Sequence, residues 1–355
     1  MNRKFLLAPT VAGLLIVATL LGAGCITEKA NNSTPSDPVR VGYLNGDLHH
    51  LALFVAKNAT VGGGKSLFEK NNVKVVDAAG APFANGGAVM TAFASGAVDI
   101  GYLGAPPAIT GNVNSLIKTK VIAQANTIGS SLVVRTGINT AQDLSGKKVA
   151  TPSASSIQNF LLLDYMETNH IDAVNVTIVN LGVALMKASL ESGQIDGFIA
   201  WQPFPADSVA SGVGHVLATS NDIWPHHVCC VVATMDGFAK KNESRVVGFL
   251  KAHVAATKWI HEAMADNTSA KYRLLVDIAV NFTSRPRNVV EAALKEIDYG
   301  YTMDATFKTA FKEYTDKLIT QGIIKQADLA KAGYSSAQDL TDKYVVTTYL
   351  DKATK

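Results

Sequence analysis

Two short stretches with the same pattern decide the fold. Ser95-Gly96-Ala97-Val98-Asp99 is echoed 97 residues later by Ser192-Gly193-Gln194-Ile195-Asp196. In each copy a segment with helical character ends at the serine, the chain turns at the glycine, and an apolar run begins. Because glycine readily adopts the left-handed conformation that ends many helices, each copy predicts a helix followed by a strand. The echo therefore indicates two similar α/β halves.

The segments around both copies alternate between strand and helix patterns. In the first half we predict strands over residues 40–44, 73–76 and 98–102 and helices over residues 51–57 and 87–95. In the second half we predict strands over residues 147–150, 176–179 and 194–199 and helices over residues 156–169 and 183–192. Beyond Asp236 the pattern is helical. This alternation predicts an α/β fold of two Rossmann-like lobes, each with a mainly parallel sheet covered by helices.

Composition excludes several classes of protein. The 355 residues suggest two domains, and a content of 48% apolar and 17% charged residues excludes a disordered chain. The 32 basic and 29 acidic side chains nearly balance, so no concentrated basic face for nucleic acid is expected. Three cysteines are too few for a disulfide framework in a chain of this length.

The first 25 residues predict export. A basic start, Met1-Asn2-Arg3-Lys4, precedes an apolar run over residues 5–21 and the small residues before Cys25. The pattern resembles the lipobox of bacterial and archaeal lipoproteins, except that Gly22 stands where leucine is usual. We therefore expect a signal peptide over residues 1–24, a lipid on Cys25, and a polar tether over residues 25–38. In the alternative, the segment stays uncleaved as a membrane anchor; both readings place the chain outside the cytoplasm.

The order and spacing of the motifs resemble ABC-importer solute-binding proteins, and more narrowly their nitrate, sulfonate and taurine group. The matching segments are residues 41–43, 92–101, 104–107, 143–150, 192–197 and 201–204. The resemblance implies a type II periplasmic-binding-protein fold, in which two hinge strands join the lobes around a ligand cleft. It places lobe 1 at residues 39–129 and 232–355 and lobe 2 at residues 130–231. It also implies an ABC permease and its ATPase as partners, no cofactor, and a monomer.

The loops that follow the predicted strands supply the candidate ligand residues, because ligands of open α/β sheets bind beyond the carboxyl ends of the strands. The candidates are Asn45, Asp47, His49, Asn85, Gly86, Gly87, Ala105, Pro106, Ser153, Ser155, Ser156, Trp201 and Gln202. Two of the loops precede helices, whose free N–H groups and dipoles favour an anion. The alternative for the serines is simple helix capping, and for Asn85-Gly86-Gly87 a tight turn.

The ligand class follows from what these loops contain. No arginine lies in the main cleft loops, which favours a monoanion or a zwitterion over sulfate or phosphate. Trp201 is either a wall for an apolar part of the ligand or a core residue. Asp47 either meets an ammonium group or is a solvated turn residue. We expect a lipid-anchored protein that captures a sulfonate, taurine or nitrate type of solute. The alternatives are a binder of a neutral pyrimidine-like precursor and an enzyme of pyrimidine or menaquinone synthesis on the same fold.

Two histidine pairs and two cysteines raise the question of a metal. His226-His227 lies close in sequence to Cys229-Cys230, and His49-His50 lies far away. Neighbouring residues on a strand point to opposite faces, so such a pair rarely chelates one ion. We therefore expect a buried strand with reduced, inert thiols, and no metal. No Gly-x-Ser-x-Gly elbow and no phosphate-binding glycine loop occurs, so the sequence predicts a binding protein and not an enzyme.

Overall fold

The computed structural model describes residues 37–60 and 64–355. The predicted signal peptide, Cys25 and nearly all of the predicted tether lie outside the described residues. Among the helices that are described, none is both long and apolar enough to span a bilayer.

One sheet has six strands in the order β11-β4-β10-β3-β1-β2. Its strands are β1 (Val39–Gly42), β2 (Val75–Asp77), β3 (Ile100–Gly104), β4 (Thr119–Thr127), β10 (Val228–Met235) and β11 (Asp298–Tyr299). Strands β1, β2 and β3 are parallel, whereas β10 runs antiparallel to β3 and β4. Every residue of β3 is buried, as expected for a central strand covered on both faces.

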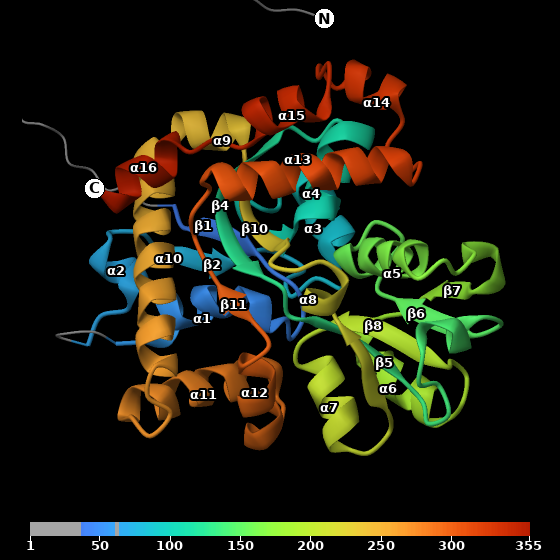
Figure 1. Cartoon of the computed structure of the whole chain (residues 1–355). Helices are drawn as coiled ribbons and strands as arrows, with labels where there is room; N and C mark the ends of the chain where they lie inside the picture. Colours follow the sequence, from blue (N-terminus) through green and yellow to red (C-terminus); the bar gives the residue numbers. More distant parts are fainter. Residues whose placement is uncertain (1–36, 61–63) are drawn as a thin grey trace, which may run out of the picture. The chain divides into compact units, whose positions relative to one another are not determined.

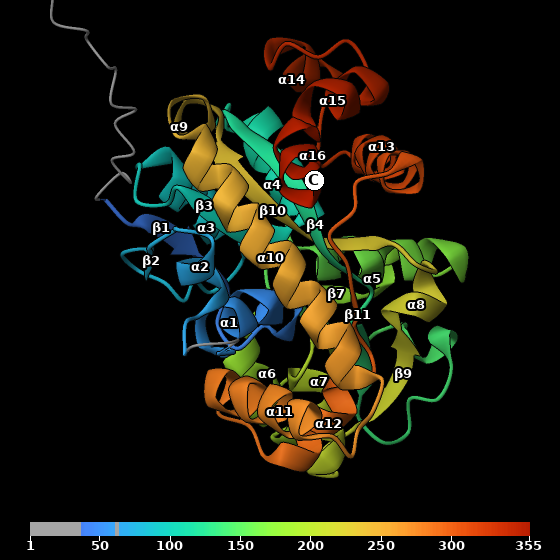
Figure 2. The ribbon, with the colours of Figure 1, turned by 90° about the vertical axis from the view of Figure 1, so that its left-hand side faces the viewer.

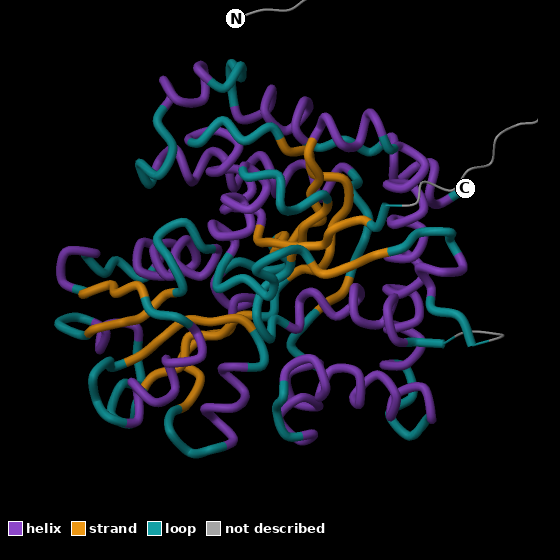
Figure 3. The backbone as a smooth tube through the Cα atoms, turned by 180° about the vertical axis from the view of Figure 1, so that it is seen from behind, coloured by secondary structure: helices purple, strands orange, loops and turns teal. Residues whose placement is uncertain are grey.

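The second sheet has five strands in the order β7-β6-β8-β5-β9. Its strands are β5 (Ser130–Val134), β6 (Lys148–Thr151), β7 (Thr177–Asn180), β8 (Gly197–Trp201) and β9 (His215–Thr219). Again three strands are parallel, and β5 runs antiparallel to β8 and β9. The series β2-β1-β3-β10 and β7-β6-β8-β5 therefore have the same arrangement. The predicted pair of Rossmann-like halves is confirmed, and both sheets are visible in Figure 3.

The chain passes between the two sheets twice. Strand β4 leads directly into β5 through Ile128-Gly129, and the return runs from the end of α8 (Ser220–Ile223) to β10. Strand β10 already pairs with the six-stranded sheet at Val228, so the boundary expected between residues 231 and 232 falls inside this strand. Figure 1 shows the passages between the two groups of strands.

The echoed sequence has the same conformation in both halves. Helix α3 (Gly86–Ala94) ends at Ser95 and helix α6 (Val183–Glu191) ends at Ser192. The glycine after each serine, Gly96 or Gly193, has a φ of +73°. This left-handed conformation is favourable for glycine and strained for other residues, which explains the glycine in both copies.

The aspartate at the end of each repeated sequence forms a hydrogen bond with the backbone of the neighbouring parallel strand. An oxygen of Asp99 accepts the backbone N–H of Arg40 at 2.9 Å, and an oxygen of Asp196 accepts that of Lys148 at 2.8 Å. Each carboxylate also pairs with a guanidinium, Asp99 with Arg40 at 2.6 Å and Asp196 with Arg135 at 2.7 Å. The two halves therefore share a structural motif longer than their common glycine turn.

Helices cover both sheets and the C-terminal segment is almost entirely helical. Beside the six-stranded sheet lie α1 (Leu51–Asn58), α2 (Leu67–Lys70), α3, α4 (Ala105–Asn114), α9 (Asp236–Lys241), α10 (Glu243–Met264), α11 (Ala270–Thr283), α12 (Arg287–Leu294), α13 (Ala305–Thr320), α14 (Gln326–Lys331), α15 (Ala337–Tyr344) and α16 (Thr348–Thr354). The five-stranded sheet carries α5 (Ile157–Thr168), α6, α7 (Phe204–Ala210) and α8, and short 3₁₀ turns are η1 (Leu48–His50), η2 (Ala141–Leu144) and η3 (Ala173–Asn175). The long helix α10 crosses one side of the first sheet and packs on α1, α2 and α16 (Figure 2).

Helix α13 connects the two halves through side chains. The ring of Tyr314 lies with its centroid 4.7 Å from that of Phe160 in α5 and 4.5 Å from that of Trp224, which lies in the second passage just after α8. One turn further on, Lys317 forms an ion pair with the buried carboxylate of Asp164 in α5. The halves therefore touch away from their two covalent connections.

Candidate functional site

Two helix starts, one from each half, lie in contact. Helix α3 begins after Asn85, whose side-chain oxygen accepts the N–H of Ala88 at 3.0 Å. Helix α5 begins after Ser156, whose hydroxyl accepts the N–H of Asn159 at 3.1 Å. A Cβ atom placed on Gly87 would lie only 3.4 Å from the hydroxyl oxygen of Ser155. The capping roles of Asn85 and Ser156 are thus real, and they also place the two helix starts against each other.

A third helix start lies beside these two. Helix α4 begins with the buried residues Ala105 and Pro106 after Gly104, and a Cβ on Gly104 would lie 3.7 Å from Cβ of Ile157. The first N–H groups of a helix have no partner within the helix, and the helix dipole makes this end attractive to anions. The sequence-predicted residues at positions 85–87, 105–106 and 153–156 therefore lie close together. Because Pro106 and Pro107 have no N–H group, α4 contributes its dipole, and the N–H donors for an anion come from the starts of α3 and α5.

Two buried polar atoms at the predicted site have no hydrogen-bond partner. They are the hydroxyl oxygen of Ser153 and the indole nitrogen of Trp201. Trp201 ends β8 and is only 2% exposed, and its ring meets that of Phe204 edge to face at 6.2 Å. Buried polar groups are nearly always paired in folded proteins, because an unpaired one costs about 1–3 kcal/mol. These two atoms therefore have the capacity to bond a solute.

The loop after β1 contacts the end of β8. The N–H of Leu48 donates to the carbonyl oxygen of Gln202 at 3.1 Å, and Gly46 lies against the ring of Phe204. The side-chain oxygen of Gln202 accepts the N–H of Ala206 at 3.2 Å, so it caps helix α7. Asn45 is exposed on the same loop. The backbone carbonyl of Gln202 therefore takes part in the contact between the halves, whereas its side-chain oxygen already accepts a hydrogen bond from Ala206.

Asp47 and His49 form a buried pair. Asp47 is 2% exposed, which makes the interpretation as a solvated turn residue wrong. Burial raises the pKa of Asp47 to about 7, although the positive charge of His49 opposes this shift. Burial disfavours charge on His49 as well, but the negative charges of Asp47 and Cys229 outweigh it and raise its pKa to about 9. With an imidazole nitrogen 3.2 Å from its carboxylate, Asp47 already has a cationic partner.

The sequence analysis missed Arg285, which lies beside the aromatic end of the site. Its guanidinium carbon is 5.1 Å from the centroid of the Phe204 ring, and its Nε is 3.3 Å from a carboxylate oxygen of Asp207. The residue follows helix α11, more than 80 positions after Trp201, so no local pattern pointed to it. Because Asp207 also pairs with Lys187, one carboxylate faces two cations, and the charge of this arginine is only partly compensated.

A groove of about 520 Å³ borders the same region. It lies between α7, β9 and α12, and Gln202 is the only sequence-predicted site residue in its lining. The other lining residues are Ser131, Ala206, Val209, Ala210, Val216, Thr219, Asn288, Ala292 and Glu296. The groove is therefore distinct from the place where the helix starts meet.

The histidine pair near the cysteines is not a chelating pair. His226 is exposed, whereas His227 is buried and its Nδ1 bonds the carbonyl oxygen of Trp224 at 2.8 Å. Cys229 and Cys230 are both buried and free. A different histidine, His49, reaches the two thiols from the loop after β1.

Comparison with known proteins assigns the family. A family model described as the NMT1-like family matches residues 33–275, about two thirds of the chain. The chain belongs to the NMT1-like family. The taurine-binding periplasmic protein of Escherichia coli K12 is 31% identical to this NMT1-like protein over 205 residues, 57% of the chain and 62% of that relative. The nitrate import ATP-binding protein NrtC of Synechocystis is 24% identical over 82% of the chain but only 46% of its own length. The chain thus spans less than two thirds of either relative.

Solved structures share the fold of this NMT1-like protein. The alkanesulfonate-binding protein SsuA of Xanthomonas axonopodis, bound to MOPS, has a TM-score of 0.69 at 18% identity, covering 83% of this chain and 97% of that one. The nitrate-binding protein NrtA of Synechocystis has a TM-score of 0.71 at 13% identity, covering 89% and 88%. The desulfurization enzyme DszB has a TM-score of 0.62 at 14% identity, covering 89% and 99%. The type II periplasmic-binding-protein fold is thereby confirmed, and it is a fold that also occurs in an enzyme.

Proposed function

We propose that this NMT1-like protein is the extracytoplasmic solute-binding component of an ABC importer. It captures a small organic or inorganic monoanion, of the sulfonate or nitrate class, between its two lobes. The named relatives, a taurine-binding and a nitrate-import protein, support the class of function. An ABC permease and its ATPase are the partners of this activity.

The observation that carries the proposal is the meeting of the α3 and α5 starts beside two unpaired polar atoms. The two helices belong to different sheets, and Gly87 of one approaches Ser155 of the other. An anion between them would accept N–H bonds from both lobes, and Ser153 and Trp201 would add two donors. Such a site is complete only when the lobes are together, so ligand binding stabilises the closed form.

The charges at the site favour a monoanion. The helix starts supply partial charges and not full ones, and the two cations Arg285 and Lys187 share the single carboxylate of Asp207, so only one net positive charge remains there for a ligand. A divalent anion would therefore remain undercompensated in a buried site. Asp47 has His49 as its partner, so it is poorly placed to hold an ammonium group. We infer that a simple alkanesulfonate or nitrate binds more tightly than taurine, sulfate or phosphate.

The lobes proposed for this closure follow the predicted ranges, residues 39–129 with 232–355 and residues 130–231, except that the second boundary is moved to the start of β10, before Val228. Removal of residues 1–24 and a lipid on Cys25 would hold the mature protein at the outer face of the cytoplasmic membrane. The polar tether over residues 25–38 would leave the cleft free to open and close. Replacing Cys25 by serine should move the protein from the membrane fraction to the soluble fraction if the signal is still cleaved.

Calorimetric titration tests the proposed ligand class. The probes are ethanesulfonate, nitrate, taurine, sulfate and uracil, each added to the purified chain at neutral pH. We expect saturable binding of ethanesulfonate or nitrate, at least about tenfold tighter than sulfate. Binding of uracil without binding of either monoanion would contradict the proposal and favour the neutral pyrimidine-like ligand. NMR spectra of a bound sulfonate after prolonged incubation should show the compound unchanged, whereas a product would indicate an enzyme.

A further inference from the structure

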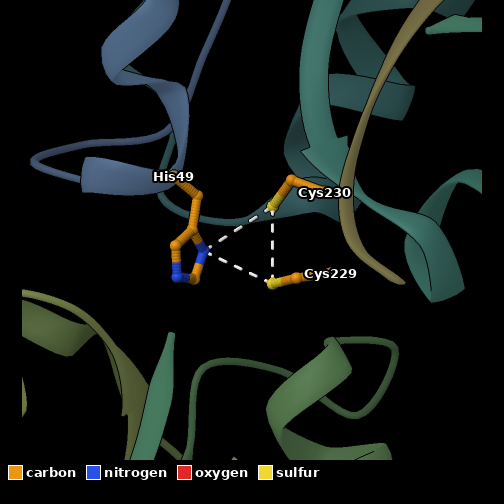
Figure 4. Close-up of side chains that lie close together, drawn as sticks. All are labelled: His49, Cys229 and Cys230. Atoms are coloured by element: carbon orange, nitrogen blue, oxygen red, sulfur yellow. Dashed lines mark hydrogen bonds between the residues drawn. The ribbon is translucent and has the colours of Figure 1, made fainter. Parts of the chain in front are cut away.

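Three potential metal ligands meet between the loop after β1 and strand β10. The Nδ1 atom of His49 lies 3.4 Å from Sγ of Cys229 and 3.7 Å from Sγ of Cys230, and the two sulfurs are 3.9 Å apart (Figure 4). All three residues are at most 2% exposed. The histidine and the cysteines are 180 residues apart in the chain, so the fold alone brings them together.

The triangle of these atoms has the size of a coordination site. A point equidistant from all three is about 2.1 Å from each, close to the 2.0–2.1 Å of a zinc–nitrogen bond and the 2.3 Å of a zinc–sulfur bond. A cation slightly out of the plane reaches the sulfurs at their usual distance with little movement of the protein.

The imidazole of His49 is already oriented as a ligand. Its Nε2 lies 2.8 Å from the carbonyl oxygen of Gly129, which can only accept, so Nε2 carries the hydrogen. The lone pair of neutral His49 is therefore on Nδ1, the atom that faces the two thiols. Metal-binding histidines commonly have their second nitrogen fixed in this way by a backbone carbonyl.

A carboxylate lies next to the triangle. An oxygen of Asp47 is 3.2 Å from Nδ1 of His49, and Asp47, His50 and Cys230 form a second group of ligand atoms within 4.8 Å. The Nε2 atom of His50 is buried without a hydrogen-bond partner, so this polar pocket is not fully satisfied as it stands. Asp47 belongs to this second group and not to the triangle, so it would become a fourth ligand by a shift of its side chain toward the cation.

We propose that His49, Cys229 and Cys230 bind a thiophilic d¹⁰ cation, either Zn²⁺ with Asp47 as fourth ligand or Cu⁺ with the three ligands alone. Two thiolates and an imidazole are the donors that such cations prefer. The site goes beyond the proposed solute binding, and it assigns Asp47 and His49 to the cation and not to the solute. The sequence analysis expected no metal because it considered the thiols together with His226 and His227.

The position of the site gives the cation a structural consequence and a route of access. Gly129 lies in the first passage between the sheets, and Cys229 is the second residue of the strand that follows the other passage. A cation would thus hold the loop after β1 against both passages. The bond of Leu48 to Gln202 crosses between the lobes and closes the loop over the site, and it would break when the lobes separate, whereas His49 and Gly129 lie in the same proposed lobe.

The test uses the full chain with Cys25→Ser, so that Cys229 and Cys230 are the only thiols, kept reduced throughout. Cobalt(II) is the first probe, because thiolate ligation gives an intense charge-transfer absorption and tetrahedral geometry gives strong visible bands. Competition with chromogenic chelators then measures Zn²⁺ and Cu⁺ separately. We expect one equivalent of cation, and a loss of affinity of at least about 100-fold in Cys230→Ser.

Two further variants make the result specific. His226→Gln removes an exposed imidazole four residues before Cys230 in the chain. This variant should bind the cation like the parent chain. Asp47→Asn should weaken Zn²⁺ by about tenfold or more and leave Cu⁺ unchanged, which separates the two cations. Absence of thiolate-to-cobalt absorption together with absence of Cu⁺ binding in the folded, reduced parent chain would overturn the proposal, as would cation binding that survives Cys230→Ser. The sulfonate and nitrate titrations are repeated on the chelator-treated chain, and they test the proposed solute binding independently of the cation.

Discussion

Ser153 offers a test in which stability and binding change in opposite directions. Its buried hydroxyl has no hydrogen-bond partner in this structure, so Ser153→Ala should leave the melting temperature unchanged or raise it. The same change removes a donor for the bound anion and should weaken binding by about fivefold to thirtyfold. Thermal unfolding and calorimetry of the same samples measure both effects.

Ser156 supplies the matched control. Its hydroxyl caps α5 and bonds the carbonyl oxygen of Ser153, so Ser156→Ala should lower the stability of the free protein by about 1 kcal/mol. If Ser153→Ala lowers the melting temperature and leaves the affinity unchanged, Ser153 is a structural residue and not a ligand-binding one.

His253 makes the stability of the protein depend on pH. It is fully buried between the hydroxyl of Tyr102 and the carbonyl oxygen of Gln124, and burial lowers its pKa to about 4. The unfolded chain takes up this proton near pH 6.5, so the stabilisation is complete above pH 6.5 and is lost as the pH falls toward 4. We expect a loss of about 2 kcal/mol between pH 7 and pH 4.5 from this residue. Urea unfolding of the parent chain and of His253→Gln at both pH values measures the contribution of this residue to the free energy of unfolding. An equal pH dependence in the variant would contradict the assignment.

At the scale of elements, the sequence predicted the helices and strands of both halves closely. The helix expected over residues 87–95 is α3, and the helix expected over residues 156–169 is α5. These boundaries were predictable because the signals are local. Both helices start at a capping side chain, and α3 ends at the turn of Gly96, whereas α5 ends at Asn169 before His170, whose φ is also positive. The capping side chains, and hence the helix starts at the candidate site, were predictable for the same reason.

The approach of α3 to the loop before α5 is an element-scale feature that can be tested. A leucine at position 87 would collide with Ser155 when the lobes are together but not when they are apart. Gly87→Leu should therefore weaken ligand binding by at least about tenfold, because it penalises the closed form alone. Calorimetry with the tightest ligand from the titrations measures this change.

Gly237→Leu is a close control for this substitution. Gly237 is the second residue of α9, as Gly87 is of α3, and no atom lies within 4 Å of the Cβ it lacks. Both variants gain the same helix propensity, so two differences remain: the contact of position 87 with Ser155 across the lobes, and its contact with the capping oxygen of Asn85, which thermal unfolding of the Gly87→Leu variant measures separately. Equal affinities in the two variants would mean that the α3 start does not meet α5 in the ligand-bound protein.

At the scale of the whole molecule, the sequence could not reveal contacts between distant segments. The approach of His49 to Cys229 and of Arg285 to Phe204 depends on how two sheets and a helical C-terminal segment pack. Hydrophobic periodicity and helix capping give information only about a residue's near neighbours in the chain, and no repeated sequence relates the segments concerned. For this reason the candidate anion site was largely predictable, whereas the cation cluster and the arginine were not.

The ion pair between Lys317 and Asp164 bridges the halves outside the site, so it tests lobe closure itself. Asp164 is buried in this arrangement, and lobe separation would return its carboxylate to water. Lys317→Ala should therefore disfavour the closed form by about 1 kcal/mol and weaken ligand binding about fivefold without any change at the ligand. Calorimetry gives the affinity, and small-angle X-ray scattering should show a larger radius of gyration for the ligand-free variant.

Lys312 separates this effect from the general effect of removing a lysine from α13. It is as exposed as Lys317, 40% against 42%, but its partner Asp316 lies one turn along the same helix. Lys312→Ala should change helix stability slightly and leave the affinity unchanged, because its ion pair exists in both the open and the closed form. If both variants bind the ligand like the parent chain, then α13 and α5 do not separate when the cleft opens, and the bridging contact belongs to a rigid part of the molecule.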